Sequence, residues 1–250
     1  MIDGLDGVGK GVVIEAIVDF EKSRGRKIFD ANKWWDTDLN RSPARDYNPR
    51  LIDFFNEFIQ YELLVTSEPT FAGIGRRIRN EYIKKNDRDY DPWLIAQAYA
   101  LDRYELYTTT IIPARERGID ILQSRGVVTS LVYQGIDMVE RGSKINTEDI
   151  LRIYGNEFTM KKENAPTLLL IPTVNDIDAL EARLKGREKQ DDSIFENMGF
   201  QRKIKPHYES ENLRKLFNDI GTEVKYLDAG ISLEYTKAEA VRIWKEHLGV

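Results

Sequence analysis

Apolar residues recur along this chain with two spacings, one typical of amphipathic helices and one typical of buried strands. Over residues 12–23, Val13, Ile14 and Ile17 share one helical face, and Gly25 follows as a stop signal. The same spacing predicts further helices over 51–61, 74–84, 92–117, 148–162, 176–185, 210–221 and 237–248. Short apolar runs predict strands over 27–31, 62–66, 119–123, 167–172 and 223–227.

This alternation of strands and helices predicts an α/β fold. Strands joined through helices run parallel, and a parallel sheet is covered by helices on both faces, so we expect three layers. The chain has 250 residues, of which 41% are hydrophobic. It can therefore bury one substantial core, and we expect a single domain spanning residues 1–250.

A glycine-rich segment lies at the start of the chain. Gly4, Gly9 and Lys10 match the phosphate-loop spacing G-x-x-x-x-G-K, in which backbone N–H groups converge on phosphate oxygens and the lysine reaches the outer phosphates. The next position, where a Ser or Thr hydroxyl usually meets Mg²⁺, is Gly11. The segment predicts nucleoside triphosphate binding by Gly4, Leu5, Asp6, Gly7, Val8, Gly9, Lys10 and Gly11.

A buried strand should precede such a loop, and here only three residues precede Gly4. We expect either a very short first strand or one that begins upstream of the given sequence, and we favour the second.

Composition narrows the class of protein. The 37 basic and 42 acidic side chains give a formal net charge of −5, which argues against a generally basic nucleic-acid binder. The sequence has no cysteine, which fits a reducing cytoplasm. Its longest apolar runs are too short to span a bilayer, so we expect no membrane partner.

Polar clusters mark the ends of two predicted strands and one helix face. Ser67-Glu68-Pro69-Thr70 and Ser124-Arg125-Gly126 each follow a strand, at the edge where ligands bind in open α/β sheets. Arg125 is placed there for bidentate contact with a phosphate. Tyr99 and Arg103 lie four residues apart, which suits a flat base with exocyclic carbonyls. Taken singly, each cluster has an ordinary alternative: a strand exit, or a core aromatic residue beside a surface arginine.

A run of basic residues, Arg183, Lys185, Arg187 and Lys189, crowds the end of a predicted helix. Such a run is usually a solvated surface. The alternative is a mobile lid that brings cations onto transferring phosphates.

In their order along the chain, these clusters resemble the thymidylate kinase family, whose members transfer the terminal phosphate of ATP to thymidine monophosphate (dTMP). The resemblance rests on residues 4–10 (GLDGVGK), 66–69 (TSEP), 99–103 (YALDR), 124–135 (SRGVVTSLVYQG) and the later Glu196, Phe200, Ile204 and Tyr208. It implies a P-loop kinase domain that uses ATP and Mg²⁺, with an insertion at about 27–61, a lid at about 183–195, and a homodimer.

The resemblance also implies roles for individual residues. Lys10 would bind the ATP phosphates, and Arg125, Arg183 and Arg187 would add catalytic charge. The acceptor nucleotide would be bound by Asp6 at the sugar, Tyr99 and Arg103 at the base, Arg125 at the phosphate, Tyr133 and Gln134 at the sugar and base, with Glu68, Pro69 and Ser130 completing the set.

Three departures from the family pattern fall on phosphate and metal handling. Gly11 replaces Ser or Thr, Ser124 replaces an Asp that is placed to hold Mg²⁺, and Ser67 replaces an Arg beside Glu68. The metal ligands are therefore left unassigned. Phosphorylation of dTMP is the leading hypothesis. The alternatives are a kinase for another deoxynucleotide or a deoxynucleoside, and a nucleotide-binding regulator with weak catalysis.

Overall fold

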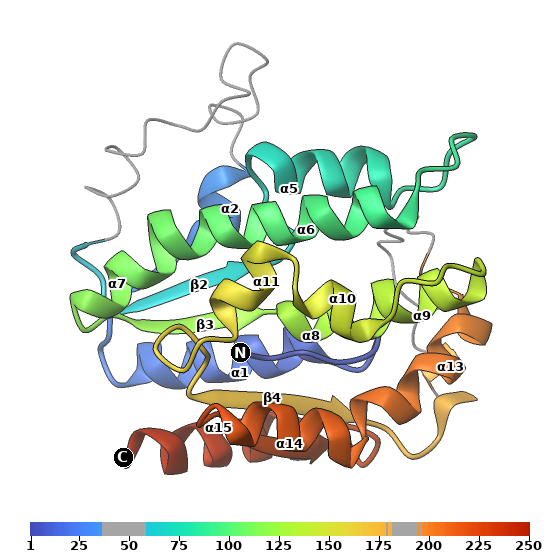
Figure 1. Ribbon diagram of the computed structural model, residues 1–250. Coiled ribbons are helices and arrows are strands. Elements are labelled where there is room, and N and C mark those ends of the chain that lie inside the picture. The colour runs from blue at the N-terminus through green and yellow to red at the C-terminus, as the bar shows by residue number, and fades with distance from the viewer. Residues whose placement is uncertain (37–58, 179, 182–194, 196) are drawn as a thin grey trace.

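The computed structural model describes residues 1–36, 59–178, 180, 181, 195 and 197–250 (Figure 1). Its strands are β1 (Ile28–Asp30), β2 (Leu63–Ser67), β3 (Asp120–Ser124), β4 (Leu168–Thr173) and β5 (Glu223–Asp228). Its helices are α1 (Lys10–Ser23), α2 (Ala31–Trp35), α5 (Gly73–Arg77), α6 (Pro92–Leu106), α7 (Ile112–Glu116), α8 (Val127–Thr129), α9 (Gly135–Glu140), α10 (Thr147–Leu151), α11 (Tyr154–Thr159), α13 (Met198–Tyr208), α14 (Glu211–Asp219) and α15 (Leu233–Leu248). Three π-helical turns connect some of them: η2 (Ile78–Tyr82), η3 (Tyr107–Ile111) and η4 (Ser130–Gln134).

All the strand pairs are parallel, as the alternating pattern predicts. β1, β2 and β3 pair in that order, and β4 pairs with β5. The two groups are joined by Ile2, which forms parallel bridges to Ser124 and to Leu170. Its N–H donates to the Gln123 carbonyl at 2.8 Å, and the Asp3 N–H donates to the Leu170 carbonyl at 3.1 Å. Met1 to Asp3 thus run between β3 and β4, and Gly4 emerges at the carboxyl ends of both strands.

Helices surround the strands and pack against one another. α1 lies along α15, where the Trp244 indole donates to the buried Glu21 carboxylate at 2.7 Å. In Figure 1, α5 and α6 lie near β2, and α14 and α15 lie near β4. α11 packs on α6 at Gly155, where an added Cβ would stand 1.9 Å from the Ala100 carbonyl oxygen. Only glycine lets the two helices approach this closely.

Several predicted elements differ from the structure. The helix predicted over 148–162 is two helices, α10 and α11, because Ile153 is extended between them. The helices at 127–140 and 198–208 were not predicted. α15 begins at Leu233 instead of 237, after a Ser232 hydroxyl that caps the Tyr235 N–H at 3.0 Å. Of the helix predicted over 51–61, residues 51–58 lie outside the described residues and 59–61 are not helical.

Candidate functional site

The phosphate loop has the backbone that its glycines predict. Gly7 and Gly9 have φ angles of 78° and 104°, in the left-handed region that favours glycine. A Cβ on Gly4 would stand 3.1 Å from the Pro172 carbonyl oxygen. α1 begins directly after Gly9 without a side-chain cap on its first N–H groups. The positive end of a 14-residue helix therefore faces the loop, which is a favourable arrangement for phosphate.

Lys10 folds over this loop. Its Nζ donates to the carbonyl oxygens of Gly4 at 2.8 Å and Leu5 at 2.5 Å, and lies 3.9 Å from Asp6 Oδ1. Its side chain is only 11% exposed. The backbone of the phosphate loop thus fixes the position of the Lys10 ammonium group, which is expected to bind the nucleotide phosphates.

Asp6 connects the loop to two other parts of the chain. Its carboxylate accepts hydrogen bonds from the guanidinium of Arg125, from the Tyr133 hydroxyl at 3.1 Å and from Gln201 Nε2 at 3.2 Å. Its backbone N–H donates to Gln201 Oε1 at 2.9 Å, so the Gln201 amide holds Asp6 at two points. The structure therefore brings Lys10, Asp6, Arg125 and Tyr133 together.

Arg125 leaves β3 in an unusual conformation. It is the only residue other than glycine with positive φ (65°) among those described, a strained backbone of the kind found at functional sites. Its Nη1 donates to Thr129 Oγ1 at 3.2 Å, and its guanidinium lies 5.3 Å from the centre of the Tyr133 ring. Arg125 is therefore held beside the phosphate loop by Asp6, Thr129 and Tyr133.

Asp3 is a structural centre that the sequence analysis did not identify. It is fully buried, and its carboxylate accepts five hydrogen bonds: from the N–H groups of Gly4, Gly126 and Thr129, and from the hydroxyls of Thr129 and Tyr208. One side chain thereby ties the phosphate loop to the first turn of α8 and to α13. The sequence signal that could have identified Asp3 is its place directly before the glycine-rich loop.

Glu68 and Arg103 form a buried ion pair. Glu68 Oε2 lies 2.6 Å from Arg103 Nη2, and both side chains are 1% exposed. Gln123 Nε2 donates to Glu68 Oε1 at 2.8 Å, and Arg103 donates to Ser130 Oγ at 3.1 Å. Burial raises the pKa of Glu68 to about 7, although the Arg103 charge opposes this. Arg103, expected at the base, therefore lies within a buried polar network, and its Nε has no hydrogen-bond partner among the described residues.

Gln134 and Tyr99 are also buried. Gln134 is 1% exposed, and within the described part of the chain neither its Oε1 nor its Nε2 has a hydrogen-bond partner. Tyr99 is 4% exposed; burial raises the pKa of its hydroxyl, while the charges of Arg125 and Arg79 lower it. Because buried polar atoms are normally paired, the Gln134 carboxamide suits a polar ligand.

A family comparison decides the identity of this arrangement. The family model for thymidylate kinase matches residues 51–239. The chain belongs to the thymidylate kinase family. Similar proteins include the thymidylate kinase of Halalkalibacterium halodurans, 29% identical over 185 residues (74% of this chain and 82% of that one). Those of Caldicellulosiruptor saccharolyticus (33% over 146 residues; 58% and 65%) and Pediococcus pentosaceus (23% over 193 residues; 77% and 87%) also match.

The matched region begins after the phosphate loop, so the loop assignment in this thymidylate kinase family member stands on its own geometry. Pro69, expected in the acceptor site, follows a cis peptide bond after Glu68. Ser130, also expected there, is fully buried against Arg103. Arg183 and Arg187, the expected lid cations, lie outside the described residues, as do Lys185, Lys189 and Glu196.

The described residues build no dedicated metal cage. None of them form a group of three His, Asp or Glu side chains placed to hold an ion. Gly11 is exposed, and a Cβ there would meet nothing within 4 Å. In proteins Mg²⁺ commonly keeps several waters and binds through substrate phosphates, which is compatible with this donor set.

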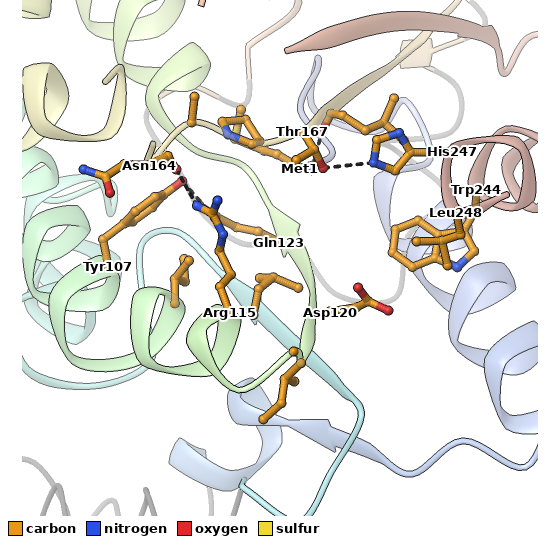
Figure 2. A pocket seen from close by; sticks show the side chains of 17 residues that line it. Met1, Tyr107, Arg115, Asp120, Gln123, Asn164, Thr167, Trp244, His247 and Leu248 are labelled. Atoms are coloured by element: carbon orange, nitrogen blue, oxygen red, sulfur yellow. Dashed lines mark hydrogen bonds between the residues drawn. The ribbon is translucent and has the colours of Figure 1, made fainter. Parts of the chain in front are cut away.

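A separate cavity of about 260 Å³ lies at the opposite end of the strands, where β3 and β4 begin (Figure 2). Tyr107, Arg115 and His247 line it, together with Met1. The Met1 ammonium donates to the Leu168 carbonyl at 2.7 Å, and burial lowers its pKa to about 5. These lining residues are distinct from those of the phosphate loop, so we do not place a nucleotide here.

None of the helices in the described part of the chain has the length and hydrophobicity of a membrane-spanning segment.

Proposed function

We propose that this protein transfers the terminal phosphoryl group of ATP to dTMP, giving dTDP and ADP. It is then a nucleoside monophosphate kinase, in agreement with the names of its relatives. The observation that carries this proposal is the Asp6 carboxylate, which joins the phosphate loop to Arg125 and Tyr133. One contact network thus spans a donor half and an acceptor half.

ATP is bound by the phosphate loop, residues 4–11. Phosphoryl transfer of this kind depends on positioning and on neutralising charge, with little covalent chemistry for the protein. Lys10 supplies a cation above the loop, and the N–H groups of α1 add the positive end of a helix. Arg125 supplies a second cation from the neighbouring strand end. Arg183 and Arg187 are proposed to add lid charge during transfer.

The acceptor base is bound by buried side chains of α6 and η4. A thymine ring offers one N–H donor flanked by two carbonyl acceptors. The Gln134 carboxamide offers one donor and one acceptor, and Arg103 Nε offers a further donor. Tyr99 supplies an aromatic face for stacking. Asp6 and Tyr133 bind the sugar, while Glu68 and Ser130 hold Arg103 and Pro69 completes the acceptor site.

A bound Mg²⁺ would supply charge neutralisation at the ATP phosphates. The two positions that commonly hold it in this family are here Gly11 and Ser124, so we assign its contacts to the nucleotide phosphates and water.

We propose a single three-layer P-loop domain over 1–250, with the insertion at 27–61 and the lid at 183–195. The continuous parallel pairing through Ile2 supports this arrangement. We further propose a cytoplasmic homodimer formed through α6 and α11. Leu94, Leu101 and Tyr154 are 43%, 53% and 60% exposed and border one groove of about 1180 Å³, an apolar surface that a second copy would cover. We propose no nucleic-acid partner and no membrane partner.

A substrate panel tests the proposal. The purified protein is incubated with ATP, Mg²⁺ and each deoxynucleoside monophosphate or thymidine in turn, and products are separated chromatographically. We expect diphosphate from dTMP, and at least about 100-fold less from Lys10→Ala, since one charged contact in a water-excluded site is worth several kcal/mol. If the protein prefers thymidine or another monophosphate, that compound is its acceptor in place of dTMP. ATP binding without any product would favour the regulator.

A further inference from the structure

The Arg103 guanidinium is held by residues from three other parts of the chain. Its Nη2 lies 2.6 Å from Glu68 Oε2 and donates to Ser130 Oγ at 3.1 Å. Its Nη1 donates to Oδ1 of Asn156, which lies on α11. These contacts engage both terminal nitrogens of a rigid, planar group. Nε is the guanidinium nitrogen that has no hydrogen-bond partner within the described part of the chain, so its N–H is the donor left for a ligand.

Asn156 reaches Arg103 because α11 lies unusually close to α6. An added Cβ on Gly155 would stand 1.9 Å from the Ala100 carbonyl oxygen, so the two helices meet there backbone to backbone. Ala100 and Arg103 are three residues apart and share one face of α6. Asn156 directly follows Gly155 and is fully buried. The close approach at Gly155 thus places an amide against an arginine that is 53 residues away along the chain.

A second hydrogen bond fixes which end of the Asn156 amide faces Arg103. Asn156 Nδ2 donates to the Ile150 carbonyl oxygen at 2.7 Å. A main-chain carbonyl only accepts hydrogen bonds, so Nδ2 must point to Ile150 and Oδ1 to Arg103. This oxygen is neutral. Asn156 therefore fixes the place of the guanidinium, while the positive charge stays paired with Glu68.

Recognition of a base depends on where the remaining donor of Arg103 lies, because a hydrogen bond weakens steeply when its angle departs from the preferred range. Ser130 lies on η4 four residues before Gln134, whose carboxamide has no partner in the described ranges either. We propose that Asn156 is a positioning residue for base recognition, which holds Arg103 so that its Nε–H meets a carbonyl oxygen of thymine. This proposal rests on the proposed function, since it concerns the acceptor base of the same site.

The test compares dTMP with dCMP, in which an amino group replaces one carbonyl of the base. A guanidinium N–H can donate to a carbonyl oxygen and not to an amino group, so the ratio of the two dissociation constants reports how well Arg103 is aligned. Both constants are measured by calorimetry without ATP. We expect the preference for dTMP to fall by about 10-fold in Asn156→Ala, the effect of one hydrogen bond to a charged group. A merely structural loss would weaken both ligands alike and leave the ratio unchanged.

Two further variants separate the contacts of Asn156. Asn156→Asp keeps the oxygen that accepts from Arg103 and loses the donor to Ile150, so it should retain most of the dTMP preference. Asn164→Ala is the matched control. Asn164 is also buried, at 8% exposed, and its Nδ2 donates to the Phe158 carbonyl oxygen at 2.8 Å. Its removal should lower stability and leave the preference unchanged.

Two results would overturn the role of Asn156: an unchanged preference in Asn156→Ala, or an equal fall in Asn156→Ala and Asn156→Asp. The second result would assign the effect to the bond with Ile150. If Asn156→Ala does not fold, Asn156→Leu replaces it, because leucine has a similar size without the polar atoms. The same fall in preference is expected there, and an unchanged ratio would refute the role.

Failure here is distinguishable from failure of the proposed function. A protein that makes no dTDP, but whose dTMP preference falls in Asn156→Ala, refutes only the activity. A protein that makes dTDP, and whose preference is unchanged in Asn156→Ala, refutes only the role of Asn156.

Discussion

Gln134 leads to a prediction in which stability and substrate affinity change in opposite directions. The side chain is 1% exposed, and neither polar atom of its carboxamide has a partner among the described residues. Each unsatisfied buried polar group costs about 1–3 kcal/mol. Methionine has a similar length and shape without those groups. Gln134→Met should therefore raise the free energy of unfolding of the ligand-free protein by about 2 kcal/mol.

The same substitution should weaken dTMP binding by about 10- to 100-fold, because the imide edge of the base would face a thioether in place of a carboxamide. Thermal unfolding without ligand measures the first effect, which corresponds to an increase in Tm of about 4–8 °C for a chain of this size. Calorimetric titration with dTMP measures the second. Leu131→Met, one turn away and also buried, is the control; it should shift stability by less than about 1.5 kcal/mol and leave dTMP affinity unchanged.

The reasoning would be refuted if Gln134→Met were less stable than the unmodified protein while binding dTMP equally well. That result would mean that the carboxamide is already satisfied in the folded protein and does not contact the base.

Three further variants test other parts of the site. Gly11→Ser adds a hydroxyl into open space, and should lower the Mg²⁺ concentration for half-maximal activity several-fold in a metal titration. Asp3→Asn places an amide donor opposite the N–H groups of Gly126 and Thr129, and should lower the free energy of unfolding in urea by about 3 kcal/mol; an unchanged value would contradict the assigned role. The Glu68 pKa of about 7 exceeds its ordinary value of 4.5, so the folded protein holds this proton more tightly than the unfolded chain does. The stability that the protonated carboxyl group contributes is fully present below pH 4.5 and is lost as the pH rises through 7. Unfolding free energy should fall by about 2–4 kcal/mol over that range, and Glu68→Gln should flatten the slope.

Local chemistry explains which parts of the site were predictable. The phosphate loop was identified because its glycines, its lysine and the start of α1 are adjacent in sequence, and each is required by backbone geometry. The strand ends that carry Glu68 and Arg125 followed from apolar runs. These features depend on only a few neighbouring residues.

The remaining site residues depend on contacts between distant segments. Gln201 contacts Asp6 from a distant helix, so it has no local signature. Asp3 has only the weak signal of its place before the glycine-rich loop, because its partners Gly126 and Thr129 are far along the chain. Gln201 also lies on α13, which was not predicted. That helix has Pro206 in its last turn and many basic residues, which weakened its periodic pattern.

Tertiary packing also overrode one strong helical pattern. Residues 148–162 read as one helix, but Asn156 turns inward, where its side chain accepts from Arg103 and donates to the Ile150 carbonyl at 2.7 Å. The buried ion pair of Glu68 and Arg103 thereby shapes a segment that periodicity alone predicts to be continuous.

The most direct test of the central claim is the stoichiometry of the reaction with dTMP. The protein is mixed with ATP, Mg²⁺ and dTMP, and the amounts of ATP, ADP, dTMP and dTDP are measured over time. The account predicts that one dTDP appears for each ADP formed, with a rate that saturates in dTMP. ADP formation without dTDP, or no conversion of either nucleotide, would contradict a site in which Asp6 joins the ATP phosphates to the acceptor.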